Sequence, residues 1–485
     1  MSDIRNLEPG DLWNYFYEIC QLPHPSRKEA KIIEYVRNFG ERNGLETIVD
    51  SVGNVIIKKA ATPGFEARKG VVLQTHLDMV PQKNSDKKHD FAKDPIEVMI
   101  DGEWVTANGT TLGSDNGIGV SAAMAVLASK DIEHGPLEAL FTIDEETGMT
   151  GAFGLKPGLI DADILINMDS EDEGELYVGC AGGIDVTATK SYSPEDVPAG
   201  MKSYRLDAKG LKGGHSGIDI PLGRANANMI IFRFLLEAET RLGVRLAESA
   251  GGDLRNAIPR EANAVVAVAA NRAEEFEMLV EEYEGIYKNE FDVTEPGLIF
   301  GCEPCDTPGS LVPEKEQYGF TRSVFACPNG VQRMSNSMEG LVETSNNLAI
   351  VRVGNGKFEA LCLTRSSVDT AKIATAQKIA GVFELTGADV KLSGEYPGWK
   401  PNMNSPILKT MLKVYNNMYG KVPEIKAIHA GLECGILGGV YPNLDMISFG
   451  PTIRSPHSPD EKVNIATVKK FWDFLLGTLR EIPVR

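Results

Sequence analysis

The chain has 485 residues, of which 42% are hydrophobic and 24% charged, and its formal net charge is −19 at pH 7. This length exceeds what one ordinary hydrophobic core supports, so we expect two or three domains. The negative charge argues against nucleic acid or an anionic membrane as a partner, because phosphate binding needs a basic surface.

The sequence predicts a cytoplasmic protein. The first residues lack the apolar core of a signal peptide, and no run of about 18 apolar residues predicts a membrane span. The seven cysteines are odd in number and widely scattered, which argues against a disulfide framework and favours a reducing compartment. The CxxC spacing at Cys302 and Cys305 lacks the second pair or nearby histidine that a zinc site needs.

Helix and strand patterns alternate in the first third of the chain. Ile32, Ile33, Val36 and Phe39 fall on one stripe of a helix predicted over 29–43. An Ala-rich helix is predicted over 117–129, and strands over 53–58, 71–77, 137–143 and 164–168. This alternation favours an α/β sheet with helices on both faces.

The pattern changes after Gly182 and Gly183. Alternating residues predict strands over 184–190, 265–269, 320–326 and 347–364, and helical periodicity predicts helices over 225–242, 272–288 and 369–383. The first pattern returns near Tyr396, with a helix over 406–419, a strand over 444–449 and a helix over 464–481. No internal repeat is visible. We therefore expect a discontinuous α/β domain, 1–185 and 395–485, with an α+β domain, 186–394, inserted in it.

A histidine and an aspartate end the predicted strand over 71–77. Residues i and i+2 of a strand share a face, so His76 and Asp78 are expected to point into the same space. A carboxylate beside a histidine can fix the ring orientation and tautomer that metal binding requires. A core histidine satisfied by a nearby acid is the alternative.

Other acids follow the next strands, where ligands of open α/β sheets bind. Asp115 lies in a Gly-rich loop, Glu145, Glu146 and Asp169 follow strands, and His457 follows the last one. Converging acids raise each other's pKa unless cations neutralise them. Histidines with carboxylates suit zinc, manganese or cobalt better than calcium or magnesium. On an extended segment, Glu145 and Glu146 would point in opposite directions, so that one binds metal and the other faces water; the residues alone do not say which.

Eight motifs along nearly the whole chain resemble one branch of the M20 metallopeptidases, the aminoacyl-histidine dipeptidases (cytosolic non-specific dipeptidases, Xaa-His dipeptidases). The motifs are HLDMV at 76–80, TLGSDNGIG at 111–119, DEETGMTGAFGL at 144–155, INMDSEDEGELYVGCAGG at 166–183, KGLKGGHSG at 209–217, RNAIPREA at 255–262, HAGLECG at 429–435 and GPTIRSPHSPDE at 450–461.

The resemblance implies a mixed-sheet catalytic domain that holds two Zn²⁺ ions per subunit, with Co²⁺ or Mn²⁺ as substitutes, and an inserted lid domain. It implies these roles: Asp115 bridges the ions, His76 and Asp169 bind one, Glu146 and His457 bind the other, Glu145 is the general base and Asp78 orients His76. A hydroxide shared by the two ions would be the nucleophile.

Residues of the inserted domain and its flank are candidates for substrate binding. Arg365 and Asn256 match positions that hold the substrate, and arginine suits a carboxylate. His215 is the candidate donor to the oxyanion, and His429 and Glu433 are candidates for the ammonium end. The alternatives are a turn-capping histidine at 215, a solvent-facing arginine at 365, and a structural turn at 429–435.

The resemblance thus implies metal-dependent hydrolysis of unblocked dipeptides, with broad specificity that includes Xaa-His dipeptides such as carnosine, by a homodimer. One alternative is a deacylase or amidase with the same metal core that acts on N-acyl amino acids. Another is a non-enzymatic metal-binding or scaffold protein, against which the intact Glu145 argues, since a binder needs no base.

Overall fold

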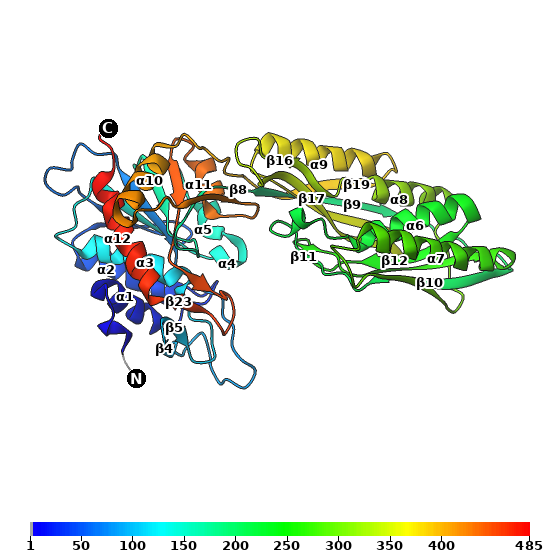
Figure 1. Ribbon diagram of the computed structural model, residues 1–485, viewed down its shortest axis with the longest axis horizontal. Coiled ribbons are helices and arrows are strands. Elements are labelled where there is room, and N and C mark those ends of the chain that lie inside the picture. Colours follow the sequence, from blue (N-terminus) through cyan, green and yellow to red (C-terminus); the bar gives the residue numbers. More distant parts are fainter. Residues whose placement is uncertain (1–2) are drawn as a thin grey trace. The chain divides into compact units, whose positions relative to one another are not determined.

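The computed structural model describes residues 3–485, which divide into two compact units. The first unit comprises Met1–Gly179, Pro401–Ala427 and Leu432–Arg485, and the second comprises Cys180–Lys400 and Ile428–Gly431. In Figure 1 the first unit contains both the blue-to-cyan N-terminal part and the orange-to-red C-terminal part, while the green and yellow middle of the chain forms the second.

The expected boundaries at 185/186 and 394/395 fall inside two strands, β9 (Gly182–Ser191) and β19 (Asp389–Tyr396). These strands pair with each other and belong whole to the sheet of the second unit. The short return of the chain to the second unit at Ile428–Gly431 has no counterpart in the expected boundaries.

The first unit is built on a mixed sheet with the strand order β1-β2-β6-β3-β7-β21-β8-β20. Its strands are β1 (Glu46–Val49), β2 (Val55–Lys59), β3 (Val71–His76), β6 (Leu137–Thr142), β7 (Ile164–Asn167), β8 (Glu175–Cys180), β20 (Glu424–Ile428) and β21 (Asp445–Ser448). The neighbours β6, β3, β7 and β21 run parallel, and β3, β6 and β7 are buried throughout, which explains their nearly continuous apolar sequences.

Helices and a small sheet complete this unit. The helices are η1 (Ile4–Asn6), α1 (Gly10–Cys20), α2 (Ala30–Arg42), α3 (Ser114–Ala128), α4 (Glu145–Gly148), α5 (Thr150–Gly154), α10 (Pro406–Tyr419), α11 (Glu433–Val440) and α12 (Ile465–Glu481). The small sheet has the order β22-β23-β5-β4, with β4 (Val98–Asp101), β5 (Trp104–Ala107), β22 (Ile453–Arg454) and β23 (Lys462–Asn464). Because α3 packs on β3 and is buried along most of its length, its N-terminus is held at the edge where β3 ends.

The second unit repeats one topology, although its sequence shows no repeat. The first copy, β10-α6-β12-β14-α7-β15, is inserted into the second, β9-α8-β17-β18-α9-β19, between β9 and α8. The sheet order β15-β10-β14-β12-β17-β18-β9-β19 is 4-1-3-2 followed by 2-3-1-4 in the numbering of each copy. The copies therefore meet through their second strands, β12 and β17, which pair antiparallel.

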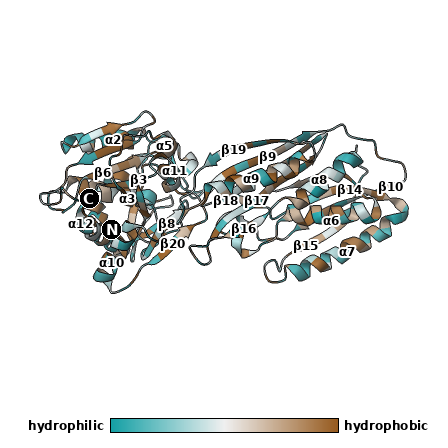
Figure 2. Ribbon diagram, turned by 90° about the horizontal axis from the view of Figure 1, so that it is seen from above, coloured by the Kyte–Doolittle hydropathy of each residue, from teal (hydrophilic) through white to brown (hydrophobic). Residues whose placement is uncertain are grey.

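The bounds of these elements are β10 (Met201–Lys209), β11 (Gly214–His215), η2 (Ile220–Leu222), α6 (Ala227–Leu242), β12 (Arg245–Gly251), β13 (Ala257–Ile258), β14 (Ala262–Ala269), η3 (Ala270–Arg272), α7 (Ala273–Glu290), β15 (Ile299–Pro304), α8 (Glu314–Ala326), β16 (Gly330–Met334), β17 (Val342–Gly354), β18 (Lys357–Ser366) and α9 (Asp369–Glu384). Buried side chains of all four long helices and of the strands form one hydrophobic cluster. The outer helix α7 is amphipathic, and Figure 2 shows hydrophobic and hydrophilic residues alternating along it.

The predicted helices over 29–43, 225–242, 272–288, 369–383, 406–419 and 464–481 are confirmed to within a few residues. The strand predicted over 320–326 is wrong, because this segment is the second half of α8. Phe320 and Val324 are buried four residues apart, and Glu314 and Glu316 lie in the first turn of the helix, where acids are favourable. No cysteine within residues 3–485 forms a disulfide, and none of the helices described is long and apolar enough to cross a bilayer.

Candidate metal centre and substrate-binding cluster

The polar residues of the first unit meet because neighbouring parallel strands end at one edge of the sheet. His76 ends β3, Asp169 follows β7, and Glu146 follows β6 in the short helix α4. Asp115 lies at the start of α3, and His457 lies in the loop between β22 and β23. The sequence prediction of a cluster at strand ends therefore follows from the order of β6, β3, β7 and β21 in the sheet.

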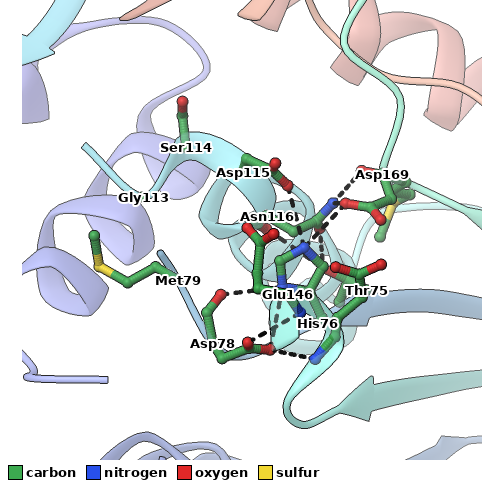
Figure 3. A network of polar contacts seen from close by, with 12 residues as sticks. Thr75, His76, Asp78, Met79, Gly113, Ser114, Asp115, Asn116, Glu146 and Asp169 are labelled. Carbon is green, nitrogen blue, oxygen red and sulfur yellow. Dashed lines mark hydrogen bonds and ion pairs between the residues drawn. The ribbon is translucent and has the colours of Figure 1, made fainter. Parts of the chain in front are cut away.

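Asp115 lies between two groups of side chains. Its Oδ1 is 3.1 Å from His76 Nε2, and its Oδ2 is 3.2 Å from His457 Nε2. His76 Nε2 is also 3.1 Å from Asp169 Oδ1, and His457 Nε2 is 2.9 Å from Glu146 Oε2. Figure 3 shows Asp115 and Asp169 on one side of the His76 ring and Asp78 on the other.

Each group could hold one metal ion. Each of two sets offers three ligand atoms within 4.8 Å of one another. One set is His76, Asp115 and Asp169, and the other is Asp115, Glu146 and His457. Glu146 Oε1 is buried without a hydrogen-bond partner among the described residues. Imidazole nitrogens with carboxylate oxygens are a donor set that suits zinc and similar transition metals. The residues therefore fit a pair of divalent cations that share Asp115.

The electrostatics of both histidines point the same way. Burial disfavours the charged form of His76, but Asp169 and Asp115 raise its pKa well above 6.5. Hydrogen bonds to Asp115 and Glu146 raise the pKa of His457 to about 11. Each imidazole and its carboxylates thus attract a positive charge between them, which a proton or a divalent cation can supply.

Asp78 contacts both the histidine and the acidic segment. Its carboxylate is 3.5 Å from His76 Nδ1 and accepts the backbone N–H groups of Glu145 at 2.9 Å and of Glu146 at 3.3 Å. His76 Nδ1 also lies 3.0 Å from the backbone carbonyl of Asp78. Asp78 therefore fixes the position of His76 and of the first turn of α4 together.

The expectation of an extended segment at Glu145 and Glu146 is wrong, because both residues lie in α4, which follows Asp144 in the left-handed region at φ 51°. Adjacent residues of a helix still point about 100° apart. Glu146 contacts His457, while Glu145 lies beside His76 and Glu146. Burial, together with nearby carboxylates such as Asp169, raises the pKa of Glu145 well above 4.5.

Glu433 contacts the two strands, β3 and β6, that lead into this cluster. It is fully buried, and its Oε2 accepts hydrogen bonds from Gln74 Nε2 at 2.6 Å and Thr142 Oγ1 at 2.7 Å. Its Oε1 is buried without a partner among the described residues, and burial raises its pKa to about 7. His429, four residues earlier in the same motif, belongs instead to the second unit.

The second unit carries a cluster around Arg365, on β18. The side chain is buried, at 5% exposure, and donates from Nη1 to the Tyr396 hydroxyl at 3.0 Å and from Nε to Ser216 Oγ at 3.3 Å. None of the described carboxylates forms an ion pair with it. A buried guanidinium held by neutral hydroxyls keeps a positive charge available for an anionic ligand.

Two uncharged histidines accompany Arg365. His429 Nε2 is 2.7 Å from Ser345 Oγ, and burial with the nearby Arg365 lowers its pKa to about 3. His215 Nδ1 accepts the backbone N–H groups of Gly217 at 3.2 Å and of Ile218 at 3.1 Å. The proton of His215 therefore resides on Nε2, which remains a donor. His215 thus caps a turn and keeps a donor as well.

Asn256 is the least constrained of the expected residues. Its side chain is exposed, and its backbone carbonyl accepts the N–H of Ser216 at 2.8 Å. The neighbouring β13 pairs with β11, so His215 lies opposite Ala257. Asn256 therefore lies beside the segment that carries His215 and Ser216.

A model of peptidase family M20/M25/M40 matches residues 72–481, which is most of the chain. The chain belongs to peptidase family M20. The motif resemblance is thereby confirmed. The M20 chain is 48% identical to the cytosol non-specific dipeptidase of Escherichia coli (strain K12) over 485 residues, which is 100% of both chains.

Solved structures agree with this assignment. The crystal structure of the aminoacylhistidine dipeptidase from Vibrio alginolyticus matches with 50% identity and a TM-score of 0.96, over 100% of this chain and 99% of the other. The aminopeptidase PepT from Bacillus cereus ATCC 10987 matches with 17% identity and a TM-score of 0.57, over 98% and 99%, and shows only the shared fold. The expected mixed α/β fold class is confirmed.

Several residues of this M20 site were not found from the sequence. They are Gln74, Asn116, Thr142, Ser216, Ser345, Tyr396 and Glu461, each of which contacts a site residue directly. Asn116, Ser216 and Glu461 stand inside the quoted motifs, so the motifs could have indicated them. Ser345 and Tyr396 lie on strands with no local signal, and only the paired sheet brings them to His429 and Arg365.

Proposed function

We propose that this M20 peptidase is a metal-dependent dipeptidase that hydrolyses unblocked dipeptides with broad specificity, including Xaa-His dipeptides such as carnosine. The observation that carries the proposal is the carboxylate of Asp115 between the two histidine groups, with Glu145 beside them. The similarity over the full chain to two proteins named as dipeptidases supports the substrate class.

The two cations are assigned to the groups that share Asp115. His76 and Asp169 complete the site of one ion, and Glu146 and His457 complete the other. Zn²⁺ is our choice, with Co²⁺ or Mn²⁺ as substitutes, since all three bind imidazole and carboxylate ligands. When bound, such a pair polarises a carbonyl and lowers the pKa of water.

Glu145 is the proposed general base. Its carboxylate takes a proton from water and returns it to the leaving amine. Burial and neighbouring acids raise its pKa, which brings the carboxyl closer to the range in which it can both accept and donate a proton at neutral pH. Asp78 positions the base by accepting the Glu145 N–H.

The cluster of the second unit is proposed to bind the substrate. Arg365, buried without a carboxylate partner, binds the free carboxylate, and His215 donates from Nε2 to the oxygen of the scissile carbonyl as negative charge develops there. Asn256, exposed beside the His215 segment, is a further polar contact. Glu433, whose Oε1 is a buried acceptor without a partner among the described residues, and His429, from the same motif, stay our candidates for the ammonium end.

The lid role of the second unit, a homodimer and a cytoplasmic location are further parts of the proposal. His215 and Ser216 belong to the same chain as Arg365, and the Ser216 hydroxyl contacts its guanidinium. This contact keeps His215 and Arg365 in one cluster of the second unit. Sedimentation at several protein concentrations tests the dimer. Activity per chain that stays constant across the dissociation range would show that His215 acts within its own subunit, and activity lost on dissociation would show that it acts on the partner's metal centre.

One experiment separates the proposed function from the alternatives. Cation content is measured by mass spectrometry, and hydrolysis is followed for free dipeptides and for the same dipeptides acetylated at the amine. We expect two cations per chain and hydrolysis of the free dipeptides alone. Equal hydrolysis of the acetylated substrates would favour a deacylase or amidase, and cation binding without any hydrolysis would favour a binding protein.

A further inference from the structure

Glu461 is a buried acid with no role in the reaction proposed above, and donors surround its carboxylate. Its exposure is 2%, and it lies at the N-terminus of α3. Among residues 3–485 it accepts the backbone N–H groups of Leu112 at 2.8 Å, Gly113 at 3.1 Å, Ser114 at 2.7 Å and Asp115 at 3.3 Å, and the Ser114 hydroxyl at 2.6 Å. The backbone groups are donors that a helix N-terminus leaves without intrahelical partners.

These hydrogen bonds join two segments that are far apart in the sequence. The loop that Glu461 holds presents Asp115, the carboxylate shared by both cation groups. Glu461 itself lies four residues after His457, and its backbone carbonyl accepts the Thr106 hydroxyl of β5 at 2.9 Å. The side chain therefore ties the His457 loop to the Asp115 loop, and the backbone ties both to the small sheet.

The two cation groups depend on this tie to different degrees. His76 is the last residue of β3, and Asp169 lies two residues after the end of β7. Both strands are in the centre of the main sheet. His457 is half-exposed, has a φ of 59°, and lies in a loop whose side-chain contacts to the cluster are those with Asp115 and Glu146. A change at Glu461 therefore moves the second group more than the first.

We propose, on the basis of the proposed metal centre, that Glu461 is a positioning residue that sets the geometry between Asp115 and His457. It thereby sets the affinity of the group Asp115, Glu146, His457 for its cation. An amide at this position places its NH₂ against N–H and O–H donors and loses hydrogen bonds, with nearly the same size and shape. If Glu461 were only a helix cap, its replacement would lower stability and leave the affinity for both cations as in the parent.

The test compares Glu461→Gln with a matched control, Glu138→Gln. Glu138 is also a buried acid of the first unit, and it accepts the backbone N–H of Asp161 at 3.0 Å, away from the cation groups. Each protein is loaded with Zn²⁺ and dialysed against graded concentrations of a chelator. Bound zinc per chain is then counted by mass spectrometry, and thermal unfolding of the zinc-free proteins is recorded.

We expect Glu461→Gln to keep one zinc under conditions in which the parent and Glu138→Gln keep two. The affinity for the lost ion should fall about 10- to 100-fold, as for other residues that orient metal ligands. Two ions retained as tightly as in the parent, with a lower melting temperature of the zinc-free protein, would overturn the proposal and leave a helix cap.

A milder variant keeps the test decisive if Glu461→Gln does not fold. Ser114→Ala removes one donor and keeps the four backbone N–H groups. It should therefore lower the affinity for the same ion by a smaller factor. Unchanged affinity for both ions in Ser114→Ala would also contradict the proposal. A parent that binds none of Zn²⁺, Co²⁺ and Mn²⁺ would instead refute the proposed function, so the two failures are distinguishable.

Discussion

The two units carry polar clusters of opposite charge. In the first unit, Asp115, Glu146 and Asp169 gather around imidazoles, and the pKa of His457 rises to about 11. In the second unit, the pKa of His429 falls to about 3 beside the buried Arg365. One cluster attracts positive charge and the other repels it.

The difference shows how each cluster is completed. Converging carboxylates are stable together only with added positive charge, so the first cluster calls for cations as part of its structure. The second cluster is held by neutral hydroxyls and uncharged imidazoles, and its guanidinium is free to meet an anion. Substitutions in the first cluster are therefore expected to lower the rate of hydrolysis or the binding of cations. Substitutions in the second cluster are expected to weaken the contacts with the substrate and to leave the cations bound.

The largest effect is expected for Glu145→Gln. The amide cannot accept a proton from water, so kcat should fall by about 10²- to 10⁴-fold. Cation content should stay at the parent's value, because Glu145 is outside both assigned cation groups. Stopped assays with a free dipeptide and zinc analysis by mass spectrometry check the two statements, and retained turnover would remove Glu145 as the base.

His215→Ala should show the next largest effect, in the second cluster. Loss of the Nε2–H donor should lower kcat by about 10²- to 10³-fold, as for other donors to a developing oxyanion. Bound zinc should be unchanged. His89→Gln, a histidine outside both clusters, is the control. An increase in KM at constant kcat would show that His215 binds the substrate's ground state instead.

Arg365→Ala should act on substrate binding. A hydrogen bond to a charged group is worth about 1.5–3 kcal/mol, so KM for a free dipeptide should rise by about 10- to 150-fold. For a dipeptide amide, which lacks the carboxylate, the KM of the same variant should equal that of the parent. Tyr396→Phe, which removes one contact of the guanidinium, should give a smaller increase in the same direction. Equal KM values for the parent and Arg365→Ala would exclude the carboxylate role.

Local patterns predicted most elements of the fold, because amphipathic helices such as 225–242 and buried parallel strands such as 71–77 carry strong periodic signals. The segment 320–326 failed because a short apolar run fits a strand as well as half a helix. The repeated topology of the second unit leaves no sequence repeat, since it is a property of strand order.

The candidate site divides in the same way. In the first cluster, His76, Glu146 and Asp169 lie in motifs at the ends of neighbouring strands, so strand order brings these three near one another. Asp115 and His457 lie in loops that Glu461 joins. Ser345 and Tyr396 contact the second cluster from positions set by the pairing of β17, β18, β9 and β19, which no local pattern encodes. Glu433 and His429 share one motif and belong to different units, and the motif gives no sign of this division.

The smallest expected effect is a change of stability with pH at His429. The folded chain keeps this imidazole neutral down to pH about 3, whereas an ordinary value of 6.5 applies to the unfolded chain. Its contribution to the free energy of unfolding is therefore complete above pH 6.5. This contribution is lost as the pH falls towards 3, by about 1.4 kcal/mol for each pH unit.

His429→Gln cannot take up a proton and can still form a hydrogen bond with Ser345, so the variant should lose less stability than the parent between pH 6.5 and 5. Hydrogen exchange of the β17 segment in zinc-free parent and variant, compared at each pH, measures this difference where it arises. Equal acid sensitivity of the two proteins would mean that the His429 imidazole is charged in the folded chain, and the contrast between the two clusters would then be lost.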